Sequence, residues 1–254
     1  MHITLTGNLG SGKSTISKIM AEKYGFEIYS TGKVIREFAA EKGISVLEMN
    51  QLMQKDNSYD HLIDDRTRQI SIERKDDLFF DSRLAWHFAV DTFKVFLCVD
   101  IDEAARRVFN DDRGDTEKYK TQEDAKAQLI ERAHTEDQRY KDIYGIDYFK
   151  ISNYNLILDS TFSKPELLAE VLISEKRRYE EAVARGEKPE TRIILAPARL
   201  AGRKAGNLED NGKIREVDAA VRMRIEAFDV EYGMQEIEKA ADDDYEFVIV
   251  KGID

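Results

Sequence analysis

The 254-residue sequence has little cysteine, little proline and no long hydrophobic stretch. Its single cysteine, Cys98, permits no disulfide within the chain. No apolar run approaches the roughly 18 residues that a membrane-spanning helix needs. The first six residues have the pattern of a strand, and no basic and apolar region typical of a secretory signal precedes them. We therefore expect a cytoplasmic protein without a membrane partner.

Net positive charge is also lacking, because 39 lysines and arginines stand against 50 aspartates and glutamates, giving a formal charge of −11. This balance opposes a general role in binding nucleic acids or anionic membranes. It does not oppose a phosphate ligand, which local donors hold. We therefore expect no nucleic-acid partner. The four histidines are scattered and lack the spacing of a metal site: His2, His61, His87 and His134.

Five short apolar runs, rich in β-branched or aromatic residues, predict buried strands at residues 2–6, 26–29, 78–80, 94–99 and 155–158. Longer charged stretches with a helical spacing of apolar residues separate them. This alternation predicts an α/β fold in which a five-stranded parallel sheet is covered by helices on both faces. Ligands of such sheets bind at the carboxyl ends of the strands, so we expect the functional residues there.

The last third of the chain suggests a further small unit. A helix is predicted at residues 165–185, because a proline stands at its start and a glycine follows its end. The polar segment 186–190 is typical of a domain boundary. We assign residues 1–185 to one domain and residues 190–254 to a small C-terminal α+β domain. In that domain we predict a strand at 192–195, a loop at 202–212, a helical run at 217–228 and a strand at 247–250.

A complete phosphate-binding loop follows the first strand: Gly7, Asn8, Leu9, Gly10, Ser11, Gly12, Lys13, Ser14 and Thr15. Its glycines permit the tight path that turns successive backbone N–H groups toward phosphate oxygens. The helix beginning near Lys13 adds its positive dipole end. Lys13 supplies a charge to the outer phosphates and Ser14 a hydroxyl ligand to Mg²⁺. A chance match is the alternative, but the strand–loop–helix context favours a phosphate-binding loop and hence an ATP-dependent phosphotransferase.

An aspartate at the end of a neighbouring strand should assist the Mg²⁺ ion. Two residues fit, Asp81 after the third strand and Asp100 after the fourth. Asp100 also suits the N-cap of the helix that follows it. The sequence pattern does not choose between the two, and Asp81 is our first choice.

These features resemble the cytidylate kinases, in particular the compact archaeal-type members of the nucleoside monophosphate kinases. The resemblance covers about residues 1–173 and depends on the order and spacing of several short motifs. These motifs are the phosphate-binding loop, Ser30-Thr31-Gly32-Lys33-Val34-Ile35-Arg36, Asp81-Ser82-Arg83-Leu84-Ala85, Arg132-x-x-x-Glu136-x-x-Arg139-Tyr140, Tyr144-Gly145-Ile146-Asp147 and the strand at 155–159. The resemblance implies an adenylate-kinase-like domain with a helical lid, with ATP and Mg²⁺ as cofactors.

The resemblance also implies an acceptor site for a nucleoside monophosphate. Arg36 and Arg83 would clamp the acceptor phosphate, since the planar guanidinium fork binds phosphate oxygens in pairs. Ser30 would lie on the same side. Asp147 would be an acceptor-side contact that orders the lid, or simply a turn residue.

The catalytic charges implied by the resemblance are Lys13 and two lid arginines. Arg132 and Arg139 are seven residues apart, so on a helix they share one face with Glu136 between them. As lid residues they would close over the transferring phosphoryl group and stabilise its charge in the transition state. The alternative is a solvated ion-pair ladder with Glu136.

Two residues depart from the family pattern, which usually has Gly where Ser82 stands and an acid where Lys33 stands. Both lie on the acceptor side and leave the identity of the acceptor open. We expect transfer of the γ-phosphate of ATP to a nucleoside monophosphate, with CMP or dCMP first. One alternative is another small acceptor; another is a nucleotide-dependent regulatory module that acts through residues 190–254.

The C-terminal segment is faintly similar to ParB/sulfiredoxin-like modules through residues 193–200 and 247–252. The match is short and apolar, so we assign no function from it. We expect an accessory packing element or a contact that forms a homo-oligomer.

Overall fold

The computed structural model describes residues 1–254 except for 46–47, 50, 53–57, 112–118 and 204–210. The chain forms two compact units. The first unit contains residues 1–6 and 13–95, and the second contains residues 7–12 and 96–254. This division differs from the boundary near residue 186 that the sequence suggests, because residues 190–254 cluster with residues 96–189.

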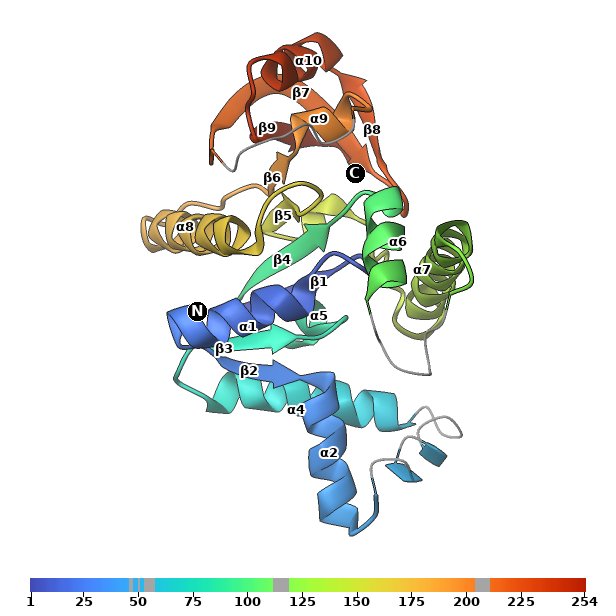
Figure 1. Ribbon diagram of the computed structural model, residues 1–254. Helices are drawn as coiled ribbons and strands as arrows, with labels where there is room; N and C mark the ends of the chain where they lie inside the picture. Colours follow the sequence, from blue (N-terminus) through green and yellow to red (C-terminus); the bar gives the residue numbers. More distant parts are fainter. Residues whose placement is uncertain (46–47, 50, 53–57, 112–118, 204–210) are drawn as a thin grey trace. The chain divides into compact units, whose positions relative to one another are not determined.

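The first unit is an α/β layer in which parallel strands alternate with helices (Figure 1). Its strand order is β2-β3-β1-β4, and both β1 and β2 run parallel to β3. The last residue of β1 and the last three residues of β4 belong to the second unit. The elements are β1 (His2–Gly7), α1 (Lys13–Tyr24), β2 (Glu27–Ser30), α2 (Thr31–Lys42), α4 (Ser58–Glu73), β3 (Leu78–Asp81), α5 (Ala85–Phe88) and β4 (Thr92–Cys98). The strands predicted here are confirmed within two residues at each end.

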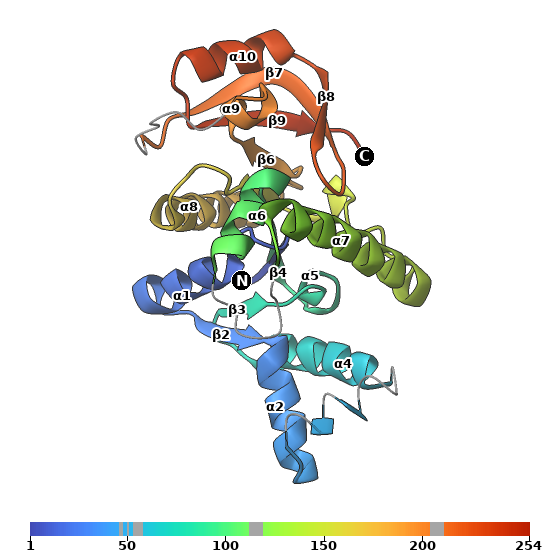
Figure 2. The same ribbon diagram turned by 45° about the vertical axis from the view of Figure 1, so that its right-hand side comes forward.

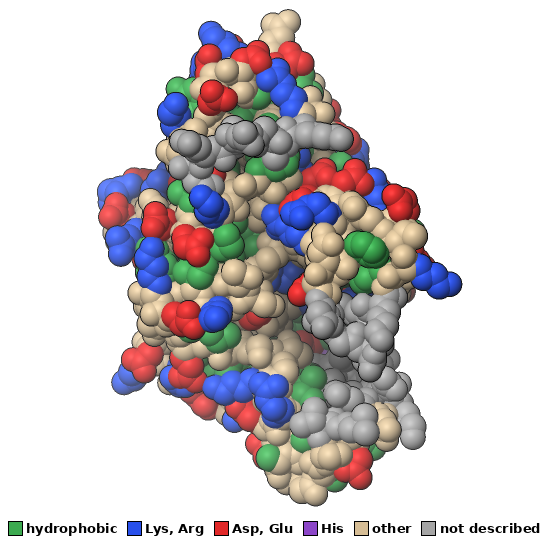
Figure 3. All heavy atoms as spheres, in the orientation of Figure 1, with side chains coloured by type: hydrophobic (Ala, Val, Ile, Leu, Met, Phe, Trp, Pro, Cys, Tyr) green, Lys and Arg blue, Asp and Glu red, His purple; other side chains and the backbone are tan. Residues whose placement is uncertain are grey.

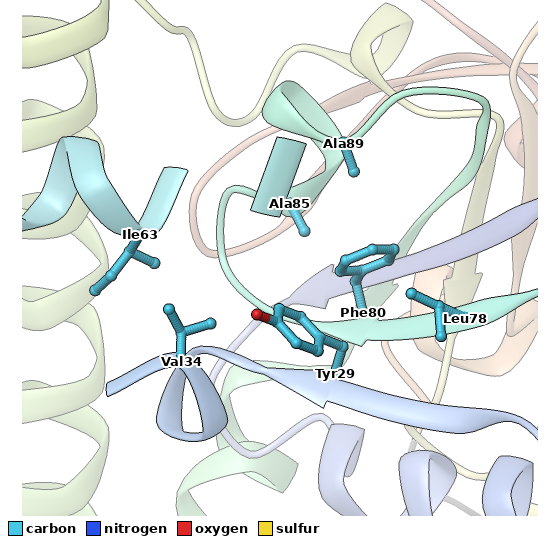
Figure 4. Close-up of a cluster of buried hydrophobic side chains, with 7 residues drawn as sticks. All are labelled: Tyr29, Val34, Ile63, Leu78, Phe80, Ala85 and Ala89. Carbon is cyan, nitrogen blue, oxygen red and sulfur yellow. The ribbon is translucent and has the colours of Figure 1, made fainter. Parts of the chain in front are cut away.

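Alternation along the strands gives each face of this layer its own core. Leu78 and Phe80 of β3 join Tyr29 of β2 in a buried cluster with α2, α4 and α5, which Figure 4 shows from the side. Phe79 points to the opposite face, where its ring meets Phe26 edge-on at 6.3 Å. Helix α1 covers that face and contacts both β2 and β3. β1 and β3 are therefore buried on both sides, whereas only Tyr29 of β2 is buried.

The second unit contains a mixed sheet with the strand order β4-β5-β6-β9-β7-β8. β6 runs parallel to β5, β9 antiparallel to β6, β7 parallel to β9, and β8 antiparallel to β7. Its elements are α6 (Ile101–Asn110), α7 (Gln122–Tyr144), the 3₁₀ helix η2 (Ile151–Asn153), β5 (Leu156–Asp159), α8 (Pro165–Ala184), β6 (Arg192–Leu195), α9 (Pro197–Leu200), β7 (Ile214–Met223), β8 (Phe228–Tyr232), α10 (Met234–Asp242) and β9 (Phe247–Gly252).

The prediction of a five-stranded parallel sheet is therefore incomplete. In the described part of the chain, β6 pairs with the free edge of β5, and β9, β7 and β8 extend the same sheet. β5 is fully buried along its length, so its outer edge needs a hydrogen-bonding partner within the protein. The strands at 192–195 and 247–250 were predicted correctly, but the pattern does not show which edge they join.

The predicted helical run at 217–228 is wrong, because these residues form most of β7 and the turn into β8. Val217, Ala219, Val221 and Met223 are buried at every second position, which is strand periodicity. A bulge between Ala220 and Val221 interrupts the register, and three consecutive residues, Ala219 to Val221, are buried there. The predicted loop at 202–212 lies mostly outside the described residues.

Two helices cover one face of the C-terminal strands (Figures 1 and 2). α10 packs on α9 and on β7 and buries Ile237 and Ala240. The predicted helix at 165–185 is confirmed as α8, with Pro165 in its first turn.

The surface carries both signs of charge. Figure 3 shows lysine and arginine side chains interspersed with aspartate and glutamate over the face drawn. In the described part of the chain, no helix is long and apolar enough to cross a membrane.

One buried ion pair joins the C-terminal strands to β5. Arg199, from α9, lies 3.2 Å from Asp159 at the end of β5, and their side chains are 7% and 0% exposed. Arg199 also donates to the carbonyl of Val99 at 3.2 Å. Burial opposes the charge of Arg199, but the carboxylates of Asp159 and Asp100 outweigh it and hold its pKa above the ordinary value. Asp159 in turn accepts the backbone N–H of Ala196.

Replacing Arg199 alone should therefore strongly destabilise the protein. Arg199→Met leaves Asp159 buried without its cation, which costs about 3–5 kcal/mol of unfolding free energy. Changing Asp159 to Asn in the same chain should recover part of that loss in urea unfolding. Arg203→Met is the control, because Arg203 is an exposed arginine that pairs with Asp242. If Arg199→Met unfolds at the wild-type urea concentration, the pair does not hold these strands in place.

Candidate nucleotide-binding site

The backbone of the predicted phosphate-binding loop lies against β4 and α6 in the second unit. Gly7 has φ = 142°, and a Cβ there would lie 2.0 Å from the carbonyl oxygen of Leu97. The N–H of Asn8 donates to the same oxygen at 3.1 Å. A Cβ at Gly10, which has φ = 76°, would lie 3.0 Å from Ala104. Both contacts require glycine, so the path of the loop is fixed by its neighbours.

Side chains within the loop hold its own backbone. The hydroxyl of Ser11 donates to the carbonyl of Asn8 at 2.8 Å, and the side-chain oxygen of Asn8 accepts the N–H of Val99 at 3.4 Å. Ser11 is buried. These two polar residues support the shape of the loop.

An arginine that the sequence analysis missed braces the loop from α6. Arg107 donates to the carbonyl of Gly10 at 3.3 Å and to those of Ser160 and Thr161 at 2.7 and 3.1 Å. Glu103 orients the guanidinium at 2.8 Å. In the sequence, Glu103 and Arg107 have only the spacing of a surface helix pair, so no local signal marks the contact with Gly10.

The first unit places Asp81 beside the first turn of α1. The hydroxyl of Ser17 lies 2.9 Å from the carbonyl oxygen of Lys13 and 3.1 Å from a carboxylate oxygen of Asp81. Ser14 is exposed on the same turn, and Lys13 is half-buried. The hydroxyl that meets Asp81 is therefore that of Ser17, and the roles of Ser14 and Asp81 at a Mg²⁺ ion stay predictions.

Asp100 serves as the N-cap of α6. One of its carboxylate oxygens accepts the N–H groups of Asp102 and Glu103 at 2.9 and 3.3 Å. Its other oxygen lies 3.9 Å from Arg199. The capping alternative is confirmed, and this carboxylate already has partners within the second unit.

The predicted acceptor residues of the first unit cluster at the ends of β2 and β3. Ser30 caps α2 by accepting the N–H of Lys33 at 3.3 Å. Arg36 is exposed one turn later, with a guanidinium nitrogen 3.5 Å from the position that a Cβ on Gly32 would take. The hydroxyl of Thr6 donates to the carbonyl of Arg83 at 3.0 Å and so anchors that residue to β1.

Lys33 and Ser82, the two residues that depart from the family pattern, both form hydrogen bonds with other side chains. Lys33 donates to Glu27 at 2.8 Å, and Arg74 donates to the other oxygen of Glu27 at 2.6 Å. The bond from Arg74, followed by that from Lys33, lowers the pKa of Glu27 to about 2. The hydroxyl of Thr31 donates to that of Ser82 at 3.1 Å. The positive charge of Lys33 is therefore balanced locally.

The predicted lid arginines lie on α7, a helix of 23 residues. Arg132 pairs with Glu136 at 2.9 Å, one turn along, which is the contact expected of an ion-pair ladder. The carbonyl of Asp147, in the loop after α7, accepts the side chain of Asn153 at 2.6 Å. The roles of Arg132, Arg139 and Asp147 in a nucleotide complex stay predictions.

The sequence matches the model of the cytidylate kinase-like family over residues 2–162. The chain belongs to this family. It is 34% identical over 191 residues to the cytidylate kinase of Haloarcula marismortui, covering 74% of this chain and 96% of that protein. It is 37% identical over 162 residues to the cytidylate kinase of Methanoregula boonei, covering 63% and 85%.

Among solved structures, an uncharacterized protein from Eubacterium ventriosum aligns with a TM-score of 0.51 at 15% identity, covering 68% of this chain and 96% of that one. This likeness concerns the fold alone. Family membership makes the chain an ATP-dependent kinase, and the expectation of a P-loop phosphotransferase is confirmed.

The contact between Arg107 of α6 and the carbonyl of Gly10 predicts an effect on ATP binding. Arg107→Met removes the bonds to three backbone carbonyls, one of them that of Gly10, and should raise the KM for ATP about ten-fold. Arg106→Met is a matched control, because Arg106 is the neighbouring arginine and pairs with Glu103 on the exposed side of α6. Steady-state kinetics should measure the KM for ATP of both variants and of the wild type. Equal KM values for ATP would show that Arg107 does not support the loop.

Proposed function

We propose that the chain transfers the γ-phosphoryl group of ATP to CMP or dCMP. The observation that carries the proposal is a glycine-dependent phosphate-binding loop, fixed against Leu97 and Ala104, in a member of the cytidylate kinase-like family. Membership of this family favours an enzyme over a nucleotide-dependent regulatory module.

On the ATP side, the N-terminal end of α1 and the loop backbone that leads into it supply donors for the β- and γ-phosphates. Lys13 adds the charge that balances the γ-phosphate as the bond to the leaving oxygen lengthens. Arg107 donates a hydrogen bond to the carbonyl of Gly10 and so holds that carbonyl toward α6. The loop thus presents donors to the anion.

Ser14 and Asp81 suit a Mg²⁺ ion. Both offer the hard oxygen atoms that Mg²⁺ prefers, and Ser17 orients the Asp81 carboxylate at 3.1 Å. The described residues contain no cluster of three or more His, Cys, Asp or Glu side chains able to hold a metal. In such sites Mg²⁺ takes one or two protein ligands and fills its shell with phosphate and water. When bound, it would neutralise charge on the phosphates.

On the acceptor side, Arg36 and Arg83 hold the phosphate of CMP, and Ser30 lies beside them. In the transfer step, an oxygen of that phosphate attacks the γ-phosphorus of ATP, and the bond to the β–γ bridging oxygen breaks. The products are ADP and CDP. Arg36 is suited to this role because its guanidinium is exposed beside the glycine that opens α2.

Arg132 and Arg139 close over the transferring group from α7, and Asp147 orders the loop that follows. Their charges match the negative charge spread over the equatorial oxygens in the transition state. The ion pair between Arg132 and Glu136 is half exposed, so it is weak enough to be exchanged for phosphate.

Removing the loop lysine tests the proposal. Lys13→Ala should lower kcat for CDP formation by about 100-fold or more, because it removes a charge that stabilises the transition state. Its thermal unfolding should stay close to that of the wild type. Lys18→Ala is a control on the exposed side of the same helix. Wild-type turnover by Lys13→Ala would reject the proposal.

The acceptor assignment predicts a selective effect. Arg36→Ala and Arg83→Ala should each raise the KM for CMP about ten-fold or more, since each removes a charge-assisted contact to its phosphate, and should change the KM for ATP much less. Arg68→Ala, an exposed arginine of α4, should leave both constants unchanged. An unchanged KM for CMP in both variants would move the acceptor site elsewhere.

A further inference from the structure

Asp159, the last residue of β5, holds the turn that follows it. Its Oδ1 accepts the backbone N–H of Thr161 at 3.0 Å and also the Thr161 hydroxyl. That hydroxyl in turn accepts the N–H of Asp100, the N-cap of α6, at 2.9 Å. All three residues of the turn, 159–161, are buried. The conformation of this turn therefore depends on one carboxylate.

The carbonyls of the same turn hold Arg107 against the phosphate-binding loop. Nη2 of Arg107 donates to the carbonyls of Ser160 and Thr161, and Nη1 donates to the carbonyl of Gly10. Because the guanidinium group is planar and rigid, fixing Nη2 on the turn also fixes the direction in which Nη1 donates. A displaced turn would therefore displace the hydrogen bond to Gly10.

Arg199 fixes the other oxygen of Asp159 from the C-terminal segment. Nη1 of Arg199 lies 3.2 Å from Oδ2 of Asp159, which also accepts the N–H of Ala196 at 3.2 Å. The guanidinium carbon of Arg199 lies 5.4 Å from the centre of the Phe228 ring at the start of β8. These groups lie beyond the family match at residues 2–162. One oxygen of the carboxylate thus contacts the C-terminal segment, and the other holds the turn.

A second set of contacts leads from Arg199 to the phosphate-binding loop. Arg199 donates to the carbonyl of Val99 at 3.2 Å, and the N–H of Val99 donates to the side chain of Asn8 at 3.4 Å. Nε of Arg199 lies 3.9 Å from Asp100, the N-cap of the helix that carries Arg107. Arg199 therefore contacts the residues that support the loop at more than one point.

Holding the C-terminal strands does not by itself require a charged pair. The cost of desolvation offsets most of the attraction in a buried pair, and apolar side chains of similar volume often pack equally well. An apolar residue at position 159 could not accept the two donors of Thr161 or the N–H of Ala196. The pair therefore serves the conformation of the turn as well as the packing of the strands.

We propose that Arg199 is a positioning residue of the ATP site. It acts through Asp159 and Thr161 on Arg107, and through Arg107 on the carbonyl of Gly10 in the phosphate-binding loop. The C-terminal segment is thereby part of the support of the nucleotide site. The inference rests on the ATP side of the proposed function and does not depend on CMP as the acceptor.

Titration calorimetry with Mg²⁺ and ATP on the full chain, without an acceptor, tests the inference. Arg199→Met should weaken ATP binding about five-fold, because the turn and the loop carbonyl lose their fixed positions. Ile237→Ala is the control, since it removes a fully buried side chain of α10. It should also lower the midpoint of urea unfolding, yet leave the Kd for ATP unchanged.

A folded Arg199→Met variant with the wild-type Kd for ATP would overturn the inference. An equal loss of affinity in Ile237→Ala would also overturn it, because the effect would then be one of general destabilisation. A wild type that binds no ATP would contradict the proposed function as well, whereas a wrong acceptor would leave these affinities unchanged.

Substitutions at Thr161 test the connection even if Arg199→Met does not fold. Thr161→Val removes the hydroxyl and should weaken ATP binding about five-fold, whereas Thr161→Ser keeps the hydroxyl and should bind ATP as the wild type does. In a chain that carries Arg107→Met, Thr161→Val should change the Kd for ATP less than about two-fold, because the residue through which it acts is gone. Equal Kd values for Thr161→Val and Thr161→Ser, or additive effects of Thr161→Val and Arg107→Met, would refute the connection.

Discussion

The close approach of Gly7 to the backbone of β4 is the constraint on which the nucleotide site depends. No side chain fits between Gly7 and the carbonyl of Leu97, and Gly10 meets Ala104 of α6 in the same way. The path of the turn after β1 is therefore set by its neighbours. Arg107 completes the arrangement by taking the carbonyl of Gly10. Close contacts at Gly7 and Gly10 thus determine the path of the loop more than its side chains do.

The end of β5, next to Arg107, also holds the C-terminal strands in place. Asp159 closes β5, and Arg199 neutralises it from a position beyond the family match. Thr161 connects the two regions, because its hydroxyl donates to Asp159 and its carbonyl accepts Arg107. The residues that brace the loop and those that hold the C-terminal strands are therefore in contact.

The sequence predicted what local patterns determine and missed what distant contacts determine. The loop, the strands of the first unit and α8 follow from glycine spacing, apolar runs and helix-end residues, and all three are confirmed. The strand β7 was mistaken for a helix because three apolar residues in succession, Ala219 to Val221, hide its alternation. Arg107 and Arg199 carry no local signal, since their partners Gly10 and Asp159 are 97 and 40 residues away. The predicted roles of Arg36, Arg83, Arg132 and Arg139 depend on a bound nucleotide and stay predictions.

The central claim, that the chain transfers the γ-phosphoryl group of ATP to CMP, is tested most directly by following that group. The full chain is incubated with ATP labelled in the γ-phosphate, Mg²⁺ and CMP, and the labelled products are separated by chromatography. Phosphoryl transfer predicts that the label appears in CDP in step with ADP formation and only when CMP is present. Label released as inorganic phosphate at the same rate with or without CMP would contradict the account, because it would show hydrolysis without an acceptor.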